Sequence, residues 1–389
     1  MPRSIVSRRG CGPARWSRAL LVVAAMVSVV PGSGAADAQP GPHGFTSPNV
    51  EHVLHLPLEV GTATGMRIVG KHLYVTSWKS FSIYDVSDPL NPRRLSTTPF
   101  GFAFENEDVA TNGKILLFSE DLPRNILHVW DVEDKTQPVE IATLAEGGGH
   151  TQTCVLGCRY AYGSSGVIVD LRDPIHPKIA GNWATPESGV YAHDVTEVSP
   201  GMVLTAGKPV QLLDARRDPT LPKVVATGYD DTYPIGLHSV DWPNRGRDAF
   251  ILGSNEALAS ARCDLSDGTF SVWGTKGFQR TRTFTLVDSW ALANGTQTDG
   301  SPAAGGMGCT AHWFDEHPTF ASSGVVALGA YEHGTRFLYV DSAGKISERG
   351  WFLPHAGETS AAYWLNDRIV YAVDYARGID VLRYVGDLR

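Results

Sequence analysis

Four histidines stand at the same position in consecutive copies of a repeated pattern, at the start of the first strand expected in each copy. They are His150, His193, His238 and His312. The other copies have polar residues at this position: Thr64, Asn106 and Ser360. Neutral imidazoles that converge on one point can bind zinc, copper, iron or nickel. The pattern therefore predicts a metal site, and the alternative is a wet channel lined by polar side chains.

Acidic residues stand beside these positions. Glu107 and Asp194 each follow one of the aligned residues directly and could orient the imidazoles by hydrogen bonding. They could equally be ordinary acids at the start of strands. If the histidines do hold a transition metal such as Zn, Cu or Fe, a metal-dependent enzyme, plausibly a redox enzyme, becomes one of two functional hypotheses.

The repeated pattern is a hydrophobic strand that ends in Asp and is followed by a turn rich in Asp and Pro. It reads FSIYDVSDPLNP, LHVWDVEDKTQP, GVIVDLRDPIHP and VQLLDARRDPTLP, with weaker copies around Asp264, Asp341 and Asp380. The copies recur at about 40 to 50 residues, the size of a propeller blade. We interpret the aspartates as turn formers, since an Asp side chain can accept backbone N–H groups two residues further on.

Each copy holds four short runs rich in Val, Ile, Tyr and Trp, without a helical period. The sequence thus predicts an all-β, seven-bladed β-propeller over residues 49–389. The last copy has three strands only, and residues 49–60 resemble the fourth strands of the other copies. We expect this N-terminal strand to complete the last blade and cover its free edge.

The motifs IYDVSDP, VWDVEDK, VIVDLRDP and LLDARRDP resemble those of the LVIVD-repeat proteins, which are extracellular β-propellers. The resemblance covers essentially the whole chain after its N-terminal segment. It implies a fold but no general activity, so the first functional hypothesis is a binding or scaffold module. Its channel mouth or loop face would take a protein, peptide, glycan or small-molecule ligand. A more distant similarity is to selenium-binding-protein and methanethiol-oxidase propellers, whose central histidines hold metal.

The N-terminus is typical of a signal peptide, expected to span residues 1–38. Five arginines precede an uncharged apolar run from Ala19 to Val30, and small residues follow. Arg8 and Arg9 leave a twin-arginine export route open. We expect a flexible segment at residues 39–48, no membrane span because the apolar run is too short, and a secreted monomer.

Without residues 1–38 the chain has 28 basic and 40 acidic side chains, a formal net charge of −12. Such a surface disfavours nucleic acid as a partner. Four cysteines remain, an even number that indicates two disulfides in an oxidising compartment. We predict the pairs Cys154–Cys158 and Cys263–Cys309. The alternatives are small buried side chains or thiolates that join the histidines on a metal.

Overall fold

The computed structural model describes residues 39–57, 63–101, 106–121, 123–184, 191–229, 236–256, 268–292, 308 and 310–389. All of them belong to one compact unit, Ala36–Arg389. The expected signal peptide and the expected Cys263–Cys309 pair lie outside the described residues. Within the described ranges, no helix is long and apolar enough to cross a membrane.

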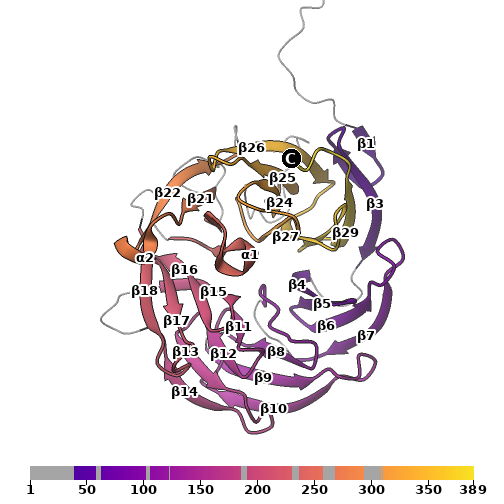
Figure 1. Ribbon diagram of the computed structural model, residues 1–389. Coiled ribbons are helices and arrows are strands. Elements are labelled where there is room, and N and C mark those ends of the chain that lie inside the picture. The colour runs from indigo at the N-terminus through magenta and orange to yellow at the C-terminus, as the bar shows by residue number, and fades with distance from the viewer. Residues whose placement is uncertain are drawn as a thin grey trace, which may run out of the picture. The chain divides into compact units, whose positions relative to one another are not determined.

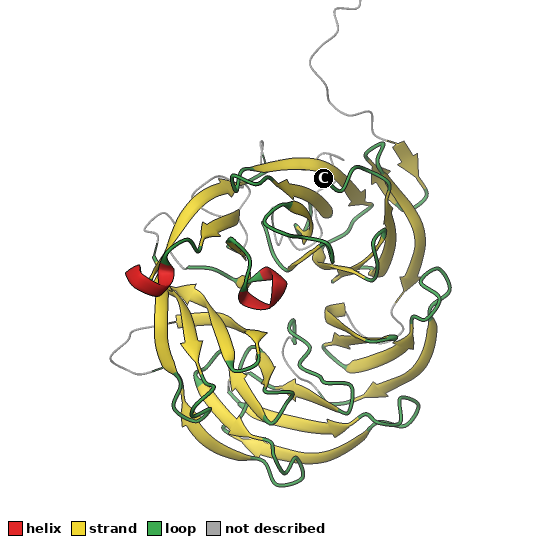
Figure 2. Cartoon of the chain, in the orientation of Figure 1, coloured by secondary structure: helices red, strands yellow, loops and turns green. Residues whose placement is uncertain are grey.

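Strands account for nearly all the regular structure, so the prediction of an all-β chain is confirmed (Figure 2). The helices in the described part of the chain are α1 (Pro243–Gly246) and α2 (Phe278–Thr281), each a single turn. Both have backbone angles of the left-handed region within or at their ends, where a longer helix cannot continue.

Most sheets consist of strands that follow one another in the chain and pair antiparallel. The first contains β4 (Ala63–Val69), β5 (His72–Ser77), β6 (Ser80–Asp85) and β7 (Arg93–Pro99). The second contains β8 (Ile115–Ser119), β9 (Ile126–Asp131) and β10 (Val139–Ala145). The third contains β11 (Gln152–Val155), β12 (Tyr160–Gly163), β13 (Val167–Asp170) and β14 (Lys178–Asn182).

Two further groups of four are joined edge to edge by a short parallel pairing of β18 with β22. One contains β15 (Tyr191–Ser199), β16 (Met202–Lys208), β17 (Val210–Asp214) and β18 (Lys223–Gly228). The other contains β19 (Ser239–Asp241), β20 (Phe250–Ser254), β21 (Phe270–Gly274) and β22 (Thr283–Trp290). The next group contains β23 (Phe314–Glu316), β24 (Gly324–Gly329), β25 (Thr335–Val340) and β26 (Ile346–Pro354).

The last sheet combines the two ends of the described chain. It contains β27 (Thr359–Trp364), β28 (Ile369–Asp374), β29 (Gly378–Tyr384) and β3 (Val50–Pro57). Strand β3 pairs antiparallel with β29 from Val50 opposite Tyr384 to Pro57 opposite Gly378. The N-terminal strand therefore occupies the fourth position in the sheet of the C-terminal strands, and it satisfies the backbone groups of β29.

Residues 39–48, expected to be flexible, instead contain two strands. They form a hairpin of β1 (Gln39–Gly41) and β2 (Gly44–Thr46). Strand β2 pairs with β26, with Gly44 opposite Pro354 and Thr46 opposite Phe352. The physical reason is that β26 is the last strand of its own group, so its outer edge offers unpaired N–H and C=O groups.

Figure 1 shows the sheets arranged around a common centre. Strands β4, β11, β15 and β27 lie toward the centre, and β3, β7, β10, β14 and β18 lie at the periphery. Apolar side chains pack between neighbouring sheets. In one cluster Tyr162 and Ile168 of the third sheet contact Val203 and Leu213 of the fourth. The first strands of the sheets are therefore the elements that position side chains near the centre.

The aspartates that end the repeated strands form turns, as interpreted from the sequence. The Oδ1 atoms of Asp85, Asp131, Asp170 and Asp214 accept hydrogen bonds from the backbone N–H groups two residues further on, at 2.9–3.1 Å. These bonds fix the chain reversal between the third and fourth strands of each copy. The repeated motif is thus a scaffold feature and stands apart from the histidine site.

Candidate metal centre

The structure places three of the aligned polar positions, Thr64, His193 and Ser360, at β-bulges on innermost strands. The pairing register shifts between Ala192 and Asp194, which leaves His193 as the extra residue of β15. Thr64 in β4 and Ser360 in β27 are the extra residues of equivalent register shifts. A bulge leaves its residue unpaired and redirects its side chain, which is why bulges are common beside functional sites.

The four histidines of the pattern lie next to one another. Ring centroids are 4.4 Å apart for His150 and His193, 3.7 Å for His193 and His238, and 4.1 Å for His238 and His312. His150 keeps 21% of its side chain exposed, whereas His238 and His312 are buried. The alignment of the repeats therefore brings together side chains that are far apart in the sequence. That these imidazoles bind metal stays a prediction.

Glu107, expected only to orient the imidazoles, faces them directly. Its Oε2 atom lies 3.3 Å from His238 Nε2 and 3.4 Å from His312 Nε2. The carboxylate is held in place because Tyr375 donates to Oε1 at 2.6 Å and Trp313 donates to Oε2 at 3.1 Å. Glu107 is buried, so its carboxylate lies in the interior of the protein.

The segment that carries Glu107 is fixed by its neighbour. The Asn106 side chain donates to the Ser119 carbonyl at 2.7 Å and accepts from the Ser119 backbone N–H at 2.8 Å. These two bonds resemble the backbone pairing that a further strand would make with β8. Strand β8 belongs to the sheet of three strands. The aligned position of this copy thus docks the segment, and Glu107 beside it directs its carboxylate toward the imidazoles.

Glu256 is a member of the cluster that the sequence did not reveal. It follows β20 closely, and its carboxylate oxygens lie 3.6 Å from His238 Nε2 and 3.7 Å from His312 Nε2. Tyr331 donates a hydrogen bond to Glu256 Oε1 at 2.5 Å. The sequence signal is weak, because Glu256 stands two residues after the end of β20, outside the aligned position.

Each of the two buried imidazoles lies at the spacing of metal ligands from both carboxylates. The four nitrogen–oxygen distances, 3.3, 3.4, 3.6 and 3.7 Å, exceed the usual length of a hydrogen bond. Two ligand atoms bound to one tetrahedral zinc ion lie about 3.3 to 3.6 Å apart. The Nε2 atoms of His238 and His312 are buried and have no hydrogen-bond partner, which is costly for polar atoms unless a ligand satisfies them.

The tautomer of His312 is suited to binding an ion. Its Nδ1–H donates to the Ser360 carbonyl at 2.7 Å, which leaves Nε2 facing the carboxylates, where it can carry a proton or bind an ion. Such a hydrogen bond to the far ring nitrogen is usual for histidines that hold metals. Ser360 is the aligned residue of the last copy, so it contributes by orienting a histidine of the neighbouring copy.

Burial and charge set the protonation of the cluster. Burial lowers the pKa of His193 well below its usual range, and it lowers the pKa of His238 as well; both rings are therefore neutral at pH 7. For Glu107, burial alone would raise the pKa, but the neighbouring His312 and His238 hold it well below its usual range. For His312, burial alone would lower the pKa, but Glu107 raises it. A metal ion at Nε2 would replace the proton that Glu107 attracts there.

His193, His150 and Asp194 occupy different places around this core. The ligand atoms of His238, Glu256 and His312 lie within 4.8 Å of one another. Those of His193, Glu107 and His238 form a second group of this kind. His150 lies between two carboxylates. Its Nε2 atom is 3.9 Å from Glu107 Oε2, and its Nδ1 atom is 3.7 Å from Asp121 Oδ2. The Asp194 carboxylate accepts a hydrogen bond from Thr196 Oγ1 at 3.2 Å and lies near Asp108. It is buried in the protein interior.

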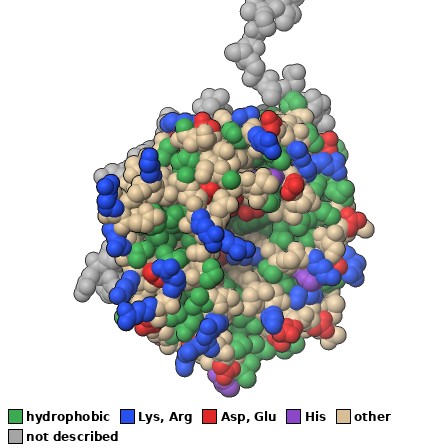
Figure 3. All heavy atoms as spheres, viewed as in Figure 1, with side chains coloured by type: hydrophobic (Ala, Val, Ile, Leu, Met, Phe, Trp, Pro, Cys, Tyr) green, Lys and Arg blue, Asp and Glu red, His purple; other side chains and the backbone are tan. Residues whose placement is uncertain are grey.

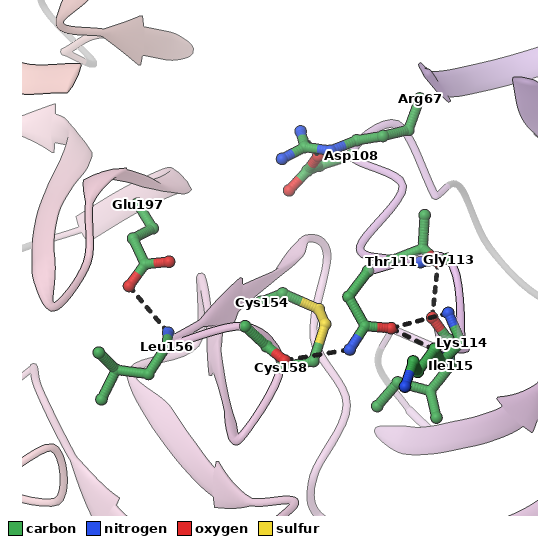
Figure 4. Close-up of a disulfide and its surroundings, with 12 residues drawn as sticks. Arg67, Asp108, Thr111, Gly113, Lys114, Ile115, Cys154, Leu156, Cys158 and Glu197 are labelled. Atoms are coloured by element: carbon green, nitrogen blue, oxygen red, sulfur yellow. Dashed lines mark hydrogen bonds and ion pairs between the residues drawn. A yellow bond between two sulfur atoms is a disulfide. The ribbon is translucent and has the colours of Figure 1, made fainter. Parts of the chain in front are cut away.

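A disulfide joins Cys154 and Cys158 across the turn between β11 and β12, with Cα atoms 4.3 Å apart. Figure 4 shows this turn held from two sides. Glu197 Oε1 accepts the Leu156 backbone N–H at 2.8 Å, and Asn112 donates to the Gly157 carbonyl at 3.0 Å. These two cysteines are therefore structural and take no part in the histidine cluster.

Comparisons with known proteins agree with the fold. Residues 60–96 match the LVIVD repeat family. A search of curated proteins found no significant match. Among solved structures, the chain is similar to the structure of U3-55K, with 10% identity, a TM-score of 0.56, and coverage of 86% of this chain and 98% of that one.

The chain is also similar to the WD40 β-propeller domain of Doa1. The identity is 10%, the TM-score is 0.57, and the match covers 86% of this chain and 97% of that domain. At this level of identity the similarity concerns the fold alone. Residues 60–96 thus carry an LVIVD repeat, and the fold of the chain is that of the β-propellers.

Proposed function

We propose that this protein is a metal-binding β-propeller whose ion is held by His238, His312, Glu107 and Glu256. The observation that carries the proposal is the set of four nitrogen–oxygen distances between these residues, which are long for hydrogen bonds and suit two ligands of one ion. Two imidazoles and two carboxylates form a mixed N and O ligand set, which suits zinc, iron or manganese better than a thiolate-seeking ion.

The other two histidines extend this site in the proposal. His193 is close enough to Glu107 and His238 to supply a further ligand. His150 is partly exposed at the outer end of the row of rings, where it can meet a molecule arriving from solvent. A metal-dependent enzyme, the alternative inferred from the sequence, would use this same centre. A bound ion would act there as a Lewis acid or lower the pKa of a bound water.

The architecture proposed around the centre has seven blades. Five blades are groups of four consecutive strands; one pairs β8, β9 and β10 with the segment containing Glu107; and the last is completed by β3. In this proposal the β3–β29 pairing closes the ring. The proposed protein is secreted after removal of residues 1–38, and a disulfide at Cys154 and Cys158 is compatible with an oxidising compartment.

Metal loading tests the proposed function. The purified full-length mature chain is stripped with chelator, loaded with ZnSO4, FeSO4 or MnCl2 in separate samples, desalted and analysed for metal by mass spectrometry. We expect about one ion per chain for at least one metal. The variants His312→Ala and Glu256→Gln should each bind that metal at least about 100-fold more weakly, because each removes a ligand.

The matched control is His176→Ala, which removes an exposed imidazole in an Asp-Pro turn. Circular dichroism should show the same β-rich spectrum for every variant. Glu256→Gln keeps the size of the side chain, so it remains informative if His312→Ala fails to fold. Failure of the wild type to retain any of the three metals, or equal retention in Glu256→Gln and wild type, would refute the centre.

A second candidate function is binding of a protein or peptide at the periphery. Ile175, Ile179, Leu221 and Val224 are apolar side chains that stay 47–69% exposed on the Asp-Pro turns and outer strands β14 and β18. Exposed apolar groups on outer strands are typical of interaction sites when they adjoin one another. Changing Ile179 and Leu221 to Ser should abolish capture of a partner without affecting metal content.

A further inference from the structure

A cavity of about 500 Å³ lies at the other end of the innermost strands. Its lining includes residues that follow the aligned positions by three along the chain: Arg67 after Thr64, Thr196 after His193, Asp241 after His238, Asp315 after His312, and Tyr363 after Ser360. At about 3.3 Å per strand residue, this level lies about 10 Å from the histidines. The two sites are therefore at opposite ends of the same strands.

Carboxyl groups dominate one side of the cavity. Asp241, Asp315 and Glu316 line it, and Glu197, which accepts two backbone N–H groups, is a fourth acid of the lining. The Oε2 atom of Glu316 is buried and has no hydrogen-bond partner. A buried carboxylate oxygen without a partner is costly unless a donor or a cation satisfies it.

The positive charge in the cavity does not balance these acids. Arg67 lies 3.5 Å from Asp108, so its guanidinium is matched by a carboxylate that is not among these acids (Figure 4). Arg245 of α1 is the other arginine in the lining. Lys or Arg side chains lie near the centre of the face on which α1 is seen, with Asp or Glu side chains beside them (Figure 3). Asp241, Asp315 and Glu316, together with Glu197, thus outnumber the two arginines of the lining.

Burial disfavours the charged form of these carboxyl groups. Burial raises the pKa of Asp241, and it raises the pKa of Glu316 well above its usual range. Burial raises the pKa of Asp315 to about 7. Arg67 lowers the pKa of Asp241 and Asp315, but by less than burial raises it. A cationic ligand beside these carboxyl groups would favour their charged forms.

The shape of the cluster favours an organic cation over a metal ion. Among the described residues, groups of three or more metal-ligating atoms within 4.8 Å of one another occur only at the histidine end. The acids of this cavity do not meet that condition. Instead, Trp242, Tyr363 and Trp364 share the lining with them, and aromatic rings are favourable neighbours of ammonium groups.

We infer that this cavity binds a small organic ammonium ion, with Asp241 and Glu316 as its anionic partners and the aromatic side chains around its carbon chain. The inference is independent of the proposed metal centre. The ligand is recognised by one positive charge next to an apolar stem, which is the chemistry of an alkylamine or of a lysine side chain.

The test uses n-butylammonium chloride as the probe and the uncharged butan-1-ol as its matched control. Metal-free full-length mature protein at pH 7.5 is titrated with each, and binding is followed by saturation-transfer NMR on the butyl protons. We expect saturable binding of butylammonium and at least ten-fold weaker binding of butanol. Equal binding of the two probes would overturn the inference, as would the absence of butylammonium binding.

A variant locates the binding. The double variant Asp241→Asn, Glu316→Gln keeps the volume of both side chains and removes their charge, so the butylammonium affinity should fall at least ten-fold. Asp173→Asn, in an exposed turn, is the control and should bind as wild type does. Competition by CaCl2 at equal ionic strength to a NaCl control would assign the cavity to a metal ion and refute an organic ligand. The probe comparison in wild type stands even if the double variant does not fold.

Discussion

The Nε2 atom of His238 and the Oε2 atom of Glu107 lie 3.3 Å apart inside the protein, and His238 Nε2 makes no hydrogen bond. A charged carboxylate and an imidazole joined by a hydrogen bond would lie closer together, because a shorter hydrogen bond between them is stronger. The separation suits two neighbouring ligands of one tetrahedral ion that lies to one side of the line between them. This relationship makes the surroundings of Glu107 the most informative place to perturb the centre.

Tyr375→Phe should weaken metal binding by about 10- to 100-fold while leaving the fold intact. The phenol donates to Glu107 Oε1 at 2.6 Å and so orients the carboxylate toward the imidazoles; loss of such an outer contact typically has this effect. Tyr371→Phe is the control, since its phenol donates to the Pro89 carbonyl instead. Metal competition titrations measure both. Equal affinities would mean that Glu107 is not a ligand.

A chain that begins at residue 58 should aggregate, because removal of β3 exposes the edge of β29 along its whole length. A chain that begins at residue 42 loses only β1 and should stay monomeric. Light scattering and size-exclusion chromatography distinguish the two. A soluble, monomeric chain from residue 58 with an unchanged melting temperature would show that β3 is dispensable for closing the last sheet.

Asp380→Asn should lower the free energy of unfolding by about 2 kcal/mol at pH 6. Burial would raise the pKa of Asp380, but hydrogen bonds from His52 and Arg377 lower it to about 2. A carboxyl group with a lowered folded-state pKa stabilises the fold above its unfolded-state pKa near 4, and this stability is lost as the pH falls toward 2.

The difference in unfolding free energy between wild type and Asp380→Asn should therefore shrink between pH 4 and pH 2. Urea unfolding across this range measures it. Asp173→Asn, which removes a carboxyl group on an exposed turn, serves as the control with a small effect at every pH. A difference between wild type and Asp380→Asn that stays constant with pH would contradict the role given to this carboxylate.

Replacing both Cys154 and Cys158 by Ser should cost about 2 kcal/mol or less, since the closed loop is short and removes little chain entropy. The turn keeps its hydrogen bonds from Leu156 to Glu197 and from Asn112 to Gly157. Metal content should be unchanged. Chemical unfolding and metal analysis measure the two effects. Loss of metal in this variant would connect the hairpin, and His150 just before it, to the centre.

The sequence predicted the scaffold because its determinants are local. The repeated turns are formed by contacts within two residues, at Asp85, Asp131, Asp170 and Asp214. The repeat and the all-β fold can therefore be inferred from the amino-acid sequence. The same periodicity aligned the four histidines, whose rings lie side by side in the structure. The position of β3 beside β29 followed from counting the strands of the last copy.

Tertiary structure decided which polar side chains meet. Glu256 reaches His238 and His312 from a position just after β20, and no repeated position marks it. The hairpin of residues 39–46 docks on β26 because a neighbouring edge is open, which the segment's own composition does not reveal. Local sequence determines strands, turns and their order, whereas the distances between side chains from different sheets depend on how the sheets pack. The candidate ligand set, and the acidic cavity three residues further along the same strands, are therefore properties of the assembled fold.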